Sequence, residues 1–589
     1  MTATGASIVA RAVTKTYLGP DGQPFQALRN ISLSIHPGEL TALVGPDGAG
    51  KSTFMRMACG LLKVDGGSLT VLGHDASREP QAIQDRISYM PQRFGLYEDL
   101  SVQENLDLYA DLHGVAMAER RQRFARLLAM TDLAKFTARP AGKLSGGMKQ
   151  KLGLACTLVR SPDLLLLDEP SVGVDPLSRR DLWQILEQLI DEEQLSVVVS
   201  TAYMDEAERC AQVYVLNQGE LLAEGSPASL RTRAAGLTYR VTPPTGVPAR
   251  NWQARLIDNR ELIVDAVPKG GAVRLIREPH CREAEISQLL DGAELQARPA
   301  ELEDAFMLLL RRHQSDDQPG PQAQPVASQT AVTAPAEGEA VIRVRNLVRK
   351  FGDFTAVAST SFEVARGEIF GLLGPNGAGK TTTFRMLCGL LPASGGQLEV
   401  AGLNLRHARA QARGRIGYVA QKFSLYGLLS VRENLDFFGG AYGLRGRHLR
   451  SRIASVLAQF DLDPAATSGD LPGGFKQRLA MAAGLLHEPE ILFLDEPTSG
   501  IDPIARRLFW RTITSLAESG VTVVITTHFM EEAEYCDRIA IQDAGQLLAL
   551  GTPQQVREQA GGDQHSDMNS AFIGVVEQSR VSLQRAGSG

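Results

Sequence analysis

The 589-residue sequence lacks any run of about 18 consecutive apolar residues, so no segment of it is predicted to span a bilayer. Its first residues have no long apolar core, and we expect no signal peptide there. The six cysteines form no CxxC pair, which argues against a disulfide framework or a zinc site and favours a reducing cytoplasm. The net charge is −6, from 61 basic and 67 acidic residues, so the chain lacks the strong positive field of a dedicated nucleic-acid binder.

The sequence contains two copies of one long pattern. GPDGAGKSTFMRMACGLL begins at Gly45, and GPNGAGKTTTFRMLCGLL begins at Gly374, 329 residues later. LLLLDEPSVGVDP at 164–176 recurs as ILFLDEPTSGIDP at 491–503, 327 residues later. A nearly constant offset over this span indicates duplicated domains of about 220 residues rather than a short solenoid repeat.

The length predicts three to five domains, at roughly 100–200 residues each. Short apolar stretches within 238–280 are expected to be β-strands, and REAEISQLLDGA and AELEDAFMLLLRR are expected to be helices. Residues 313–340 have no aromatic side chain and are rich in Pro, Gln, Ala and Ser, which is typical of disordered or extended chain. The predicted regions are a nucleotide-binding domain (1–236), a small α/β accessory domain (237–312), a flexible linker (313–340), a second nucleotide-binding domain (341–558) and a tail with a short helix (559–589).

The motif GxxxxGK[ST] occurs in both copies, each time after an apolar strand. A glycine-rich loop lets backbone N–H groups converge on phosphate oxygens, and the helix that follows points its positive end at the same place. Lys51 and Lys380 are expected to reach the β- and γ-phosphates, and Ser52 and Thr381 to supply a hydroxyl to Mg²⁺. The loop residues expected to bind nucleotide are Gly45, Pro46, Asp47, Gly48, Ala49, Gly50, Lys51, Ser52 and Thr53, and Gly374, Pro375, Asn376, Gly377, Ala378, Gly379, Lys380, Thr381 and Thr382.

LLLLDEP and ILFLDEP describe two buried parallel strands that end in paired carboxylates. Asp168 and Asp495 are expected to hold Mg²⁺, directly or through water. Glu169 and Glu496 are expected to polarise the attacking water. An apolar run ending in Asp-Glu is weak evidence alone, but its recurrence after a phosphate loop in both copies predicts nucleotide hydrolysis.

LSGGMKQ at 144–150 lies between these two motifs in the first copy. With it, both halves, about three quarters of the chain, resemble ATP-binding cassette (ABC) ATPases. The resemblance implies an α/β fold of two P-loop NTPase cassettes in tandem, each with a mixed sheet core and a helical signature subdomain. It also implies ATP and Mg²⁺ as cofactors, and two cassettes that close head to tail around two ATP molecules.

Further site residues follow from the same resemblance. Gln92 and Gln421 match the Q-loop glutamine that contacts Mg²⁺ and water, and Asp175 and Asp502 match the D-loop. The signature residues would face the γ-phosphate held by the opposite cassette; they are Ser145, Gly146, Gly147, Gly473 and Gly474. The aromatic residues Tyr17 and Phe351 would stack on adenine. An aromatic residue at a strand end is also common in a protein core, so the adenine assignment is the weaker of these.

The two halves differ at two positions. The second signature reads LPGGFKQ, with Pro472 in place of the serine, so the fold survives but the hydroxyl donor is lost. The switch histidine of the family is present as His528, whereas the first half has Ala202 there. Pairing the halves with each other puts both defects in the site of Lys51 and leaves the site of Lys380 complete. We therefore expect one hydrolytic site, with Glu496 and His528, and one mainly ATP-holding site, which keeps the catalytic glutamate as Glu169.

The segments after the Q-loop glutamines resemble cassettes of ABC-2-type drug exporters, in a form with two fused cassettes. This resemblance implies that the chain powers separate transmembrane permease subunits, two of them, in multidrug or xenobiotic export. It would lie on the cytoplasmic face of the bacterial inner membrane, with membrane contact only through the permease and no nucleic acid bound.

The alternative is a soluble twin-cassette translation factor that acts on the ribosome. Such proteins typically join their cassettes by a long charged helical hairpin and keep a serine in both signatures. The region between the two copies here is β-rich and then Pro/Ala/Gln-rich, with no basic run, which favours the exporter.

Overall fold

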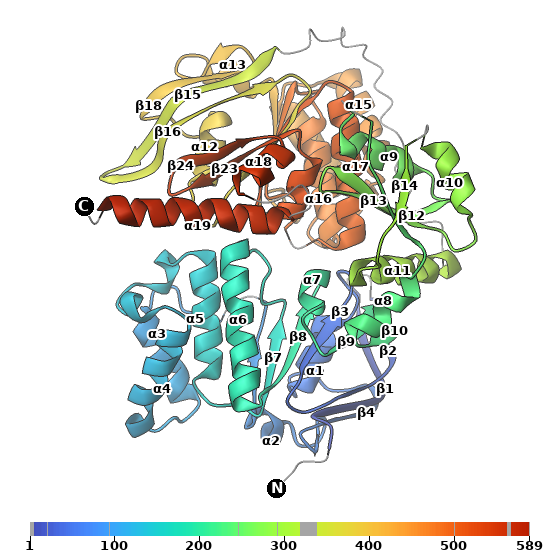
Figure 1. Cartoon of the computed structure of the whole chain (residues 1–589), viewed down its shortest axis with the longest axis vertical. Helices are drawn as coiled ribbons and strands as arrows, with labels where there is room; N and C mark the ends of the chain where they lie inside the picture. The colour runs from blue at the N-terminus through green and yellow to red at the C-terminus, as the bar shows by residue number, and fades with distance from the viewer. Residues whose placement is uncertain are drawn as a thin grey trace. The chain divides into compact units, whose positions relative to one another are not determined.

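The computed structural model of the chain describes residues 5–19, 22–92, 95–244, 247–290, 293–317, 339–499, 501–561 and 567–587. They divide into two units (Figure 1). The first contains the residues up to Gly236 together with Pro299–His313, and the second contains Leu237–Arg298 and the residues from Gln314 onward. The chain therefore leaves the first unit at Gly236 and re-enters it at Pro299. Most of the predicted linker lies outside the described residues, as do 562–566 of the predicted tail.

Two sheets form the strand-rich part of the first unit. The antiparallel sheet has the order β2-β1-β4-β5, and the mixed sheet has the order β10-β9-β3-β8-β7-β6, in which only β10 runs antiparallel to its neighbour. The strands are β1 (Ile8–Leu18), β2 (Pro24–Ile35), β3 (Leu40–Val44), β4 (Gly66–Val71), β5 (His74–Asp75), β6 (Ile87–Met90), β7 (Leu164–Asp168), β8 (Ser196–Thr201), β9 (Gln212–Asn217) and β10 (Glu220–Gly225).

The central strands of this mixed sheet are rich in Leu, Val and Ala, with a few Ser, Thr and Asp residues. Every residue of β3, β7 and β8 is buried, as expected of parallel strands covered on both faces. Helices α3, α4 and α5 gather on one side of the unit, away from β1 and β4 (Figure 1). The helices are α1 (Lys51–Ala58), α2 (Pro80–Gln84), α3 (Val102–Leu112), α4 (Met117–Met130), α5 (Gly146–Leu158), α6 (Pro176–Glu193), α7 (Met204–Ala207) and α8 (Pro227–Arg231), with short 3₁₀ turns at Ala134–Phe136, Ala141–Lys143 and Thr232–Ala234.

The second cassette repeats this plan, with sheets ordered β16-β15-β18-β19 and β20-β21-β22-β17-β23-β24. Its strands are β15 (Ala340–Phe351), β16 (Phe354–Ala365), β17 (Ile369–Leu373), β18 (Gly395–Val400), β19 (Leu403–Asn404), β20 (Ile416–Val419), β21 (Ile491–Asp495), β22 (Thr522–Thr527), β23 (Arg538–Asp543) and β24 (Gln546–Gly551). Its helices are α12 (Lys380–Leu387), α13 (Arg409–Arg413), α14 (Val431–Ala441), α15 (Gly446–Phe460), α16 (Gly473–Leu485), α17 (Pro503–Glu518), the 3₁₀ helix η4 (Met530–Tyr535), α18 (Pro553–Gln559) and α19 (Met568–Gly587).

The segment between the cassettes forms a separate antiparallel sheet of order β12-β13-β11-β14. With its two helices it has the order β-α-β-β-α-β, the split βαβ topology of ferredoxin-like domains. The elements are β11 (Thr238–Val241), α9 (Ala249–Asp258), β12 (Ile263–Lys269), β13 (Ala272–Arg277), α10 (Glu283–Leu289) and β14 (Leu295–Ala297). We call residues 237–298 the accessory domain from here on.

Part of the expected secondary structure of this segment is wrong. The stretch RLIDN (255–259) lies in the region 238–280 that is expected to form strands, but it is the end of helix α9. Trp252 and Leu256 are four residues apart and both are buried in the core of the domain, which is the spacing of a helix face. Strand β14 was not expected at all, since Leu295–Ala297 is short and lies at the sheet edge.

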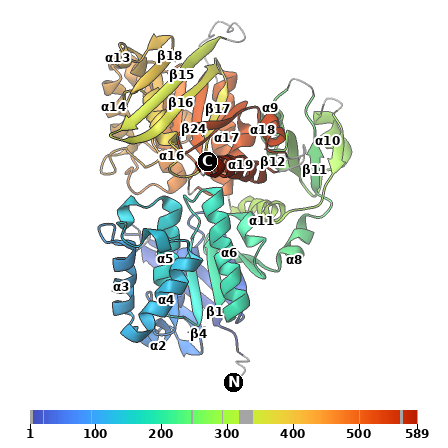
Figure 2. The same ribbon diagram turned by 60° about the vertical axis from the view of Figure 1, so that its left-hand side comes forward.

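Two equivalent helices follow the two cassettes. Helix α11 (Leu302–Asp317) belongs to the first unit through Pro299–His313, and the backbone N–H of Leu302 donates to Glu208 Oε1 at 2.9 Å. The helix expected to be short in the tail is the 20-residue α19, which lies beside α18 and β24 and has Phe572 fully buried (Figure 2). Among the described residues, no helix is both long and apolar enough to cross a membrane.

Candidate functional site

The phosphate loops lie between a buried strand and a helix in both cassettes, β3–α1 and β17–α12. Gly50 and Gly379 end the loops at φ of 101° and 99°, a region that L-residues with a side chain rarely occupy. A Cβ atom at Gly50 would also lie 2.7 Å from the carbonyl oxygen of Ala27, and one at Gly379 would lie 2.4 Å from that of Ala356. Only glycine therefore permits the turn that aims the helix N-terminus at the loop.

The loop lysines are buried beneath their own loops. Lys51 Nζ donates to the carbonyl oxygens of Gly45 and Pro46 at 2.8 and 3.1 Å, and Lys380 Nζ makes the equivalent pair of bonds at 2.5 and 3.0 Å. Lys51 Nζ also lies 3.3 Å from Glu169 Oε1. The positive charge is thus placed inside the loop, where a phosphate chain would be wrapped.

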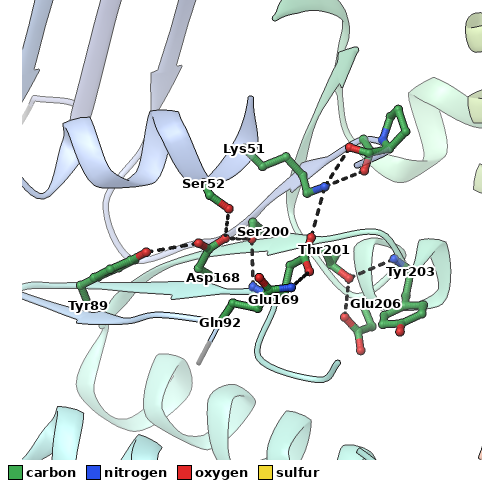
Figure 3. Close-up of polar contacts among 12 residues, drawn as sticks. Lys51, Ser52, Tyr89, Gln92, Asp168, Glu169, Ser200, Thr201, Tyr203 and Glu206 are labelled. Atoms are coloured by element: carbon green, nitrogen blue, oxygen red, sulfur yellow. Dashed lines mark hydrogen bonds and ion pairs between the residues drawn. The ribbon is translucent and has the colours of Figure 1, made fainter. Parts of the chain in front are cut away.

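The carboxylate of Asp168, at the end of β7, collects three hydroxyl groups (Figure 3). Oδ1 accepts from Ser52 Oγ at 3.0 Å and from Ser200 Oγ at 2.6 Å, and Oδ2 accepts from Tyr89 at 3.2 Å. The structure thus brings together Ser52 and Asp168, two of the three residues predicted to contact a metal ion in the first cassette, whereas the third, Gln92, contacts Glu169.

Both predicted catalytic glutamates have left-handed backbone, with φ of 49° at Glu169 and 45° at Glu496. Non-glycine residues in this region cost free energy and persist where the surroundings hold them. Here the N–H of Glu169 donates to Ser200 Oγ at 2.9 Å, and that of Glu496 donates to Thr526 Oγ1 at 3.0 Å. The same hydroxyl therefore fixes the glutamate backbone and the neighbouring aspartate.

The Q-loop glutamines reach these carboxylates in the same way in both cassettes. Gln92 Nε2 donates to Glu169 Oε2 at 2.7 Å, and Gln421 Nε2 donates to Glu496 Oε2 at 2.7 Å. Both glutamines are otherwise exposed, so each connects a buried carboxylate to the protein surface.

The second cassette adds a histidine to this arrangement. His528 Nδ1 lies 3.2 Å from Glu496 Oε2, although the angle of the contact falls short of hydrogen-bond geometry. Burial alone would raise the pKa of Glu496, but His528, Lys380 and Gln421 outweigh it and hold the pKa below its ordinary value. The carboxylate is therefore kept ionised, as a group that orients water must be.

The neighbouring Asp495 is tuned in the opposite direction. Burial raises its pKa, and the charge of Glu496 adds to the rise, against the hydrogen bond of 2.6 Å that Thr526 Oγ1 donates. A divalent cation at this carboxylate would remove the cost of its charge.

The signature residues begin helices α5 and α16. Ser145 is the N-cap of α5 and accepts from the N–H of Met148 at 3.3 Å, whereas Pro472 holds the equivalent position in α16. Gly147 is required by packing, since a Cβ there would lie 2.1 Å from Ser178 Oγ on α6. The glycines Gly146, Gly473 and Gly474 complete the first turns of the two helices.

The remaining predicted residues lie where the motifs place them. Asp175 and Asp502 cap helices α6 and α17 by accepting from backbone N–H groups three residues later. Tyr17 and Phe351 lie near the ends of β1 and β15 with partly exposed rings, each beneath a cation, Lys15 and Arg349 respectively.

Ser200 and Thr526 were missed from the sequence, as was Tyr89. They lie on strands other than those that carry the Asp-Glu pairs, and the register pairs Asp168 with Ser200 and Asp495 with Thr526. In both copies, the strand before the switch position ends in two hydroxyl residues. This repeated pattern could have indicated Ser200 and Thr526 from the sequence.

The residues present fit a nucleotide with Mg²⁺. Ser52 and Asp168 offer a hydroxyl and a carboxylate oxygen 3.0 Å apart, which are the hard oxygen donors that Mg²⁺ takes. In the second cassette Nε2 of the buried His528 has no hydrogen-bond partner among the described residues. A buried polar atom of this kind points to a ligand that completes it.

Comparison with known proteins identifies the family. The model described as ABC transporter matches residues 28–172 and 357–499. The chain is 49% identical over 577 residues, 97% of its length and 98% of the relative's, to "Probable multidrug ABC transporter ATP-binding protein YbhF" of Escherichia coli (strain K12). It is 41% identical over 244 residues, 40% of its length and 78% of the relative's, to "Linearmycin resistance ATP-binding protein LnrL" of Bacillus subtilis (strain 168). A solved "Structure of ATP binding subunit of ABC transporter" aligns with a TM-score of 0.38 and 26% identity, over 40% of this chain and 99% of that chain.

The chain belongs to the ABC transporter family and carries two of its ATP-binding cassettes. It is therefore an ATP-binding protein and an ATPase, as the motifs predicted, and the α/β fold of two tandem cassettes is confirmed. The resemblance to a form with two fused cassettes is also confirmed, since the match covers 98% of the Escherichia coli relative.

Proposed function

We propose that the chain is the ATP-hydrolysing subunit of an exporter of drug-like compounds, acting through two separate ABC-2-type permease subunits. It would work at the cytoplasmic face of a bacterial inner membrane, and Mg²⁺ would accompany ATP. The near full-length relative, whose name describes a multidrug ABC transporter ATP-binding protein, supports the proposal. No feature of the described residues favours action on the ribosome.

A surface beside the Q-loop of the second cassette supports a protein partner. In the second cassette Leu428 is 97% exposed, and the rings of Tyr426 and Phe437 beside it are about half exposed. Clustered exposed apolar side chains mark interaction surfaces. Since Gln421 of the same segment contacts Glu496, a partner bound there would be linked to the ATP site through a single side chain.

The single observation that carries the asymmetry is the carboxylate environment. Glu496 has both Gln421 and His528 against it, whereas the first cassette has Ala202 where His528 would be. The head-to-tail pairing of the family would add the hydroxyl of Ser145 to the site of Glu496 and the proline ring of Pro472 to the site of Glu169. We therefore assign hydrolysis to the site of Lys380, and mainly ATP holding to the site of Lys51.

ATP turnover of Glu496→Gln against Glu169→Gln tests the asymmetry. We expect Glu496→Gln to lose nearly all turnover and Glu169→Gln to retain most of it. Vanadate trapping of 8-azido-ATP, with the label mapped to each phosphate-loop peptide by mass spectrometry, reports the two sites separately. Equal losses together with equal trapping at the two loops would contradict the assignment.

A tagged pull-down from detergent-solubilised membranes tests the partner. We expect stoichiometric recovery of polytopic hydrophobic subunits with the chain. Recovery of ribosomal proteins from the soluble fraction, with nothing from the membrane, would replace the exporter by a translation factor and leave the site assignments unchanged.

A further inference from the structure

The accessory domain is joined to the second cassette by a buried ion pair. Nε of Arg507, on α17, donates to both carboxylate oxygens of Asp265, on β12, at 3.3 and 3.2 Å. The side chains are 7% and 5% exposed. Removing one partner of an ion pair buried to this extent strongly destabilises the fold, because the other charge is left uncompensated.

Two further ion pairs join the same bodies. Arg511, one turn further along α17, binds Asp258 of α9 with two bonds of 3.0 and 2.7 Å. Arg250 of α9 pairs with Asp537, whose other oxygen accepts from the backbone N–H of Ile369 at the start of β17 at 2.9 Å. The contacts therefore reach both a helix and the central sheet of the second cassette.

The anchored elements lead directly to the ATP site. Helix α17 begins at its cap Asp502, the D-loop residue, and η4 begins two residues after His528. The accessory domain also donates from the N–H of Gly271 to Glu534 of η4, at 3.4 Å. Both segments that hold predicted site residues are thus braced from outside the cassette.

Two of the three anchoring charges of the second cassette are absent from the first. Where the second cassette has Arg511 and Asp537, the first has Gln184 and Ala211. Arg507 has a counterpart in Arg180, but Arg180 pairs with its sequence neighbour Asp181, at 3.8 Å and with both side chains well exposed. The accessory domain follows the first cassette in the chain, yet the charges that bind it are on the second.

We propose that the accessory domain is a positioning element of the second ATP site, and that Arg507 and Asp265 are the positioning residues that transmit its effect. The ion pair holds α17, and the contact of Gly271 with Glu534 holds η4, so that Asp502 and His528 stay aligned with Glu496. The proposal rests on the proposed function only in taking Glu496 as a catalytic residue. The accessory domain then affects the rate of ATP hydrolysis at the second site and leaves the affinity of that site for ATP unchanged.

The test uses the full chain with Arg507→Asp, Asp265→Arg and the two changes combined. The readout is vanadate trapping of 8-azido-ATP at each phosphate-loop peptide, beside labelling without vanadate and the thermal unfolding temperature. We expect either single change to lower trapping at the second loop by roughly 2- to 30-fold, the range of such remote couplings, with the first loop unaffected. Labelling without vanadate stays unchanged, and the combined change restores trapping. Arg180→Asp is the matched control and leaves both loops at the wild-type level.

Two results would overturn the proposal. One is wild-type trapping in a single variant that unfolds at the wild-type temperature, and the other is an equal loss at both loops, which indicates general damage. If the single variants do not fold, Arg511→Gln, which introduces the residue of the first cassette at a more exposed pair, takes their place. A folded Arg511→Gln chain with unchanged trapping at the second loop would equally overturn it. The label at each phosphate loop is measured separately. Equal trapping at the two loops of the wild-type chain would therefore contradict the proposed asymmetry, while the comparison of the variants at the second loop would still test the role of the accessory domain.

Discussion

In the first cassette the carboxylate of Glu169 lies 3.3 Å from Lys51 and accepts from Gln92, whereas in the second cassette Glu496 accepts from Gln421 and lies 3.2 Å from His528. The backbone that presents the two glutamates is the same, with left-handed φ and a hydroxyl that fixes the N–H. The cassettes have therefore diverged at the group beside the carboxylate and not in the scaffold that holds it. A scaffold shared in this way would bind nucleotide at both sites, as the proposed asymmetry requires.

The surroundings of the two cassettes differ in a related way. Glu208 and Glu534 occupy equivalent positions, but Glu208 accepts from the first turn of α11, and Glu534 accepts from the accessory domain and pairs with the buried Arg557. The cassette with the fuller catalytic set is also the one that carries the additional domain.

The largest effect is expected from His528→Ala, which gives the second cassette the residue of the first. ATP turnover should fall by about 100- to 1000-fold, as when one positioned group of a catalytic site is removed. Ala202→His is the matched change in the first cassette and should leave turnover near the wild-type value, since Pro472 still replaces the serine. A steady-state ATPase assay measures both, and similar effects of the two changes would remove the distinction between the cassettes.

The signature motifs give the next comparison. Ser145→Ala removes the hydroxyl that the head-to-tail arrangement brings to the site of Glu496, and turnover should fall by about 100-fold. Pro472→Ser restores a hydroxyl at the other site, but without a histidine at Ala202 it should not raise turnover. If Ser145→Ala left turnover intact while Pro472→Ser raised it, the like cassettes of two chains, rather than the two cassettes of one, would form the sites.

Much of the site could be predicted because its chemistry lies in continuous motifs. The strand–loop–helix order around Lys51 and the apolar strand before Asp168 are local patterns, and each fixes where its side chains point. Ser200 and Thr526 could not be found this way, because their contact with the aspartates depends on which strands are neighbours in the sheet.

The contact between the accessory domain and the second cassette could not be predicted from the sequence either. Asp265 and Arg507 are 242 positions apart, and neither belongs to a motif. Ordinary charged residues at such a distance give no sign that they are buried against each other. Helix α9 was missed for a more local reason, since its apolar residues Leu256 and Ile257 are adjacent and resemble a short strand.

The pH dependence of turnover distinguishes the role of His528 from simple packing. Because the pKa of Glu496 is held below its ordinary value, its carboxylate stays ionised as the pH falls, until the pH passes that lowered pKa. His528→Gln removes a group that lowers this pKa, so the acidic limb of the single-turnover rate should move to higher pH. If the rate fell equally at every pH and the acidic limb stayed at the same pH, the histidine would only fill space beside Glu496.

The smallest expected effect concerns stability rather than turnover. Ser145 caps α5 with a hydrogen bond from Met148, and Pro472 begins α16 without a side-chain acceptor. Pro472→Ser should therefore stabilise the second cassette by about 1 kcal/mol, and Ser145→Ala should destabilise the first by a similar amount, in line with the usual contribution of a helix N-cap. Hydrogen exchange of the amides in the first turns of α5 and α16 measures each cassette separately. A loss of protection in α16 on Pro472→Ser would show instead that the fixed φ of proline stabilises this helix start more than a hydroxyl would, and that the second cassette exchanged a phosphate contact for a firmer signature helix.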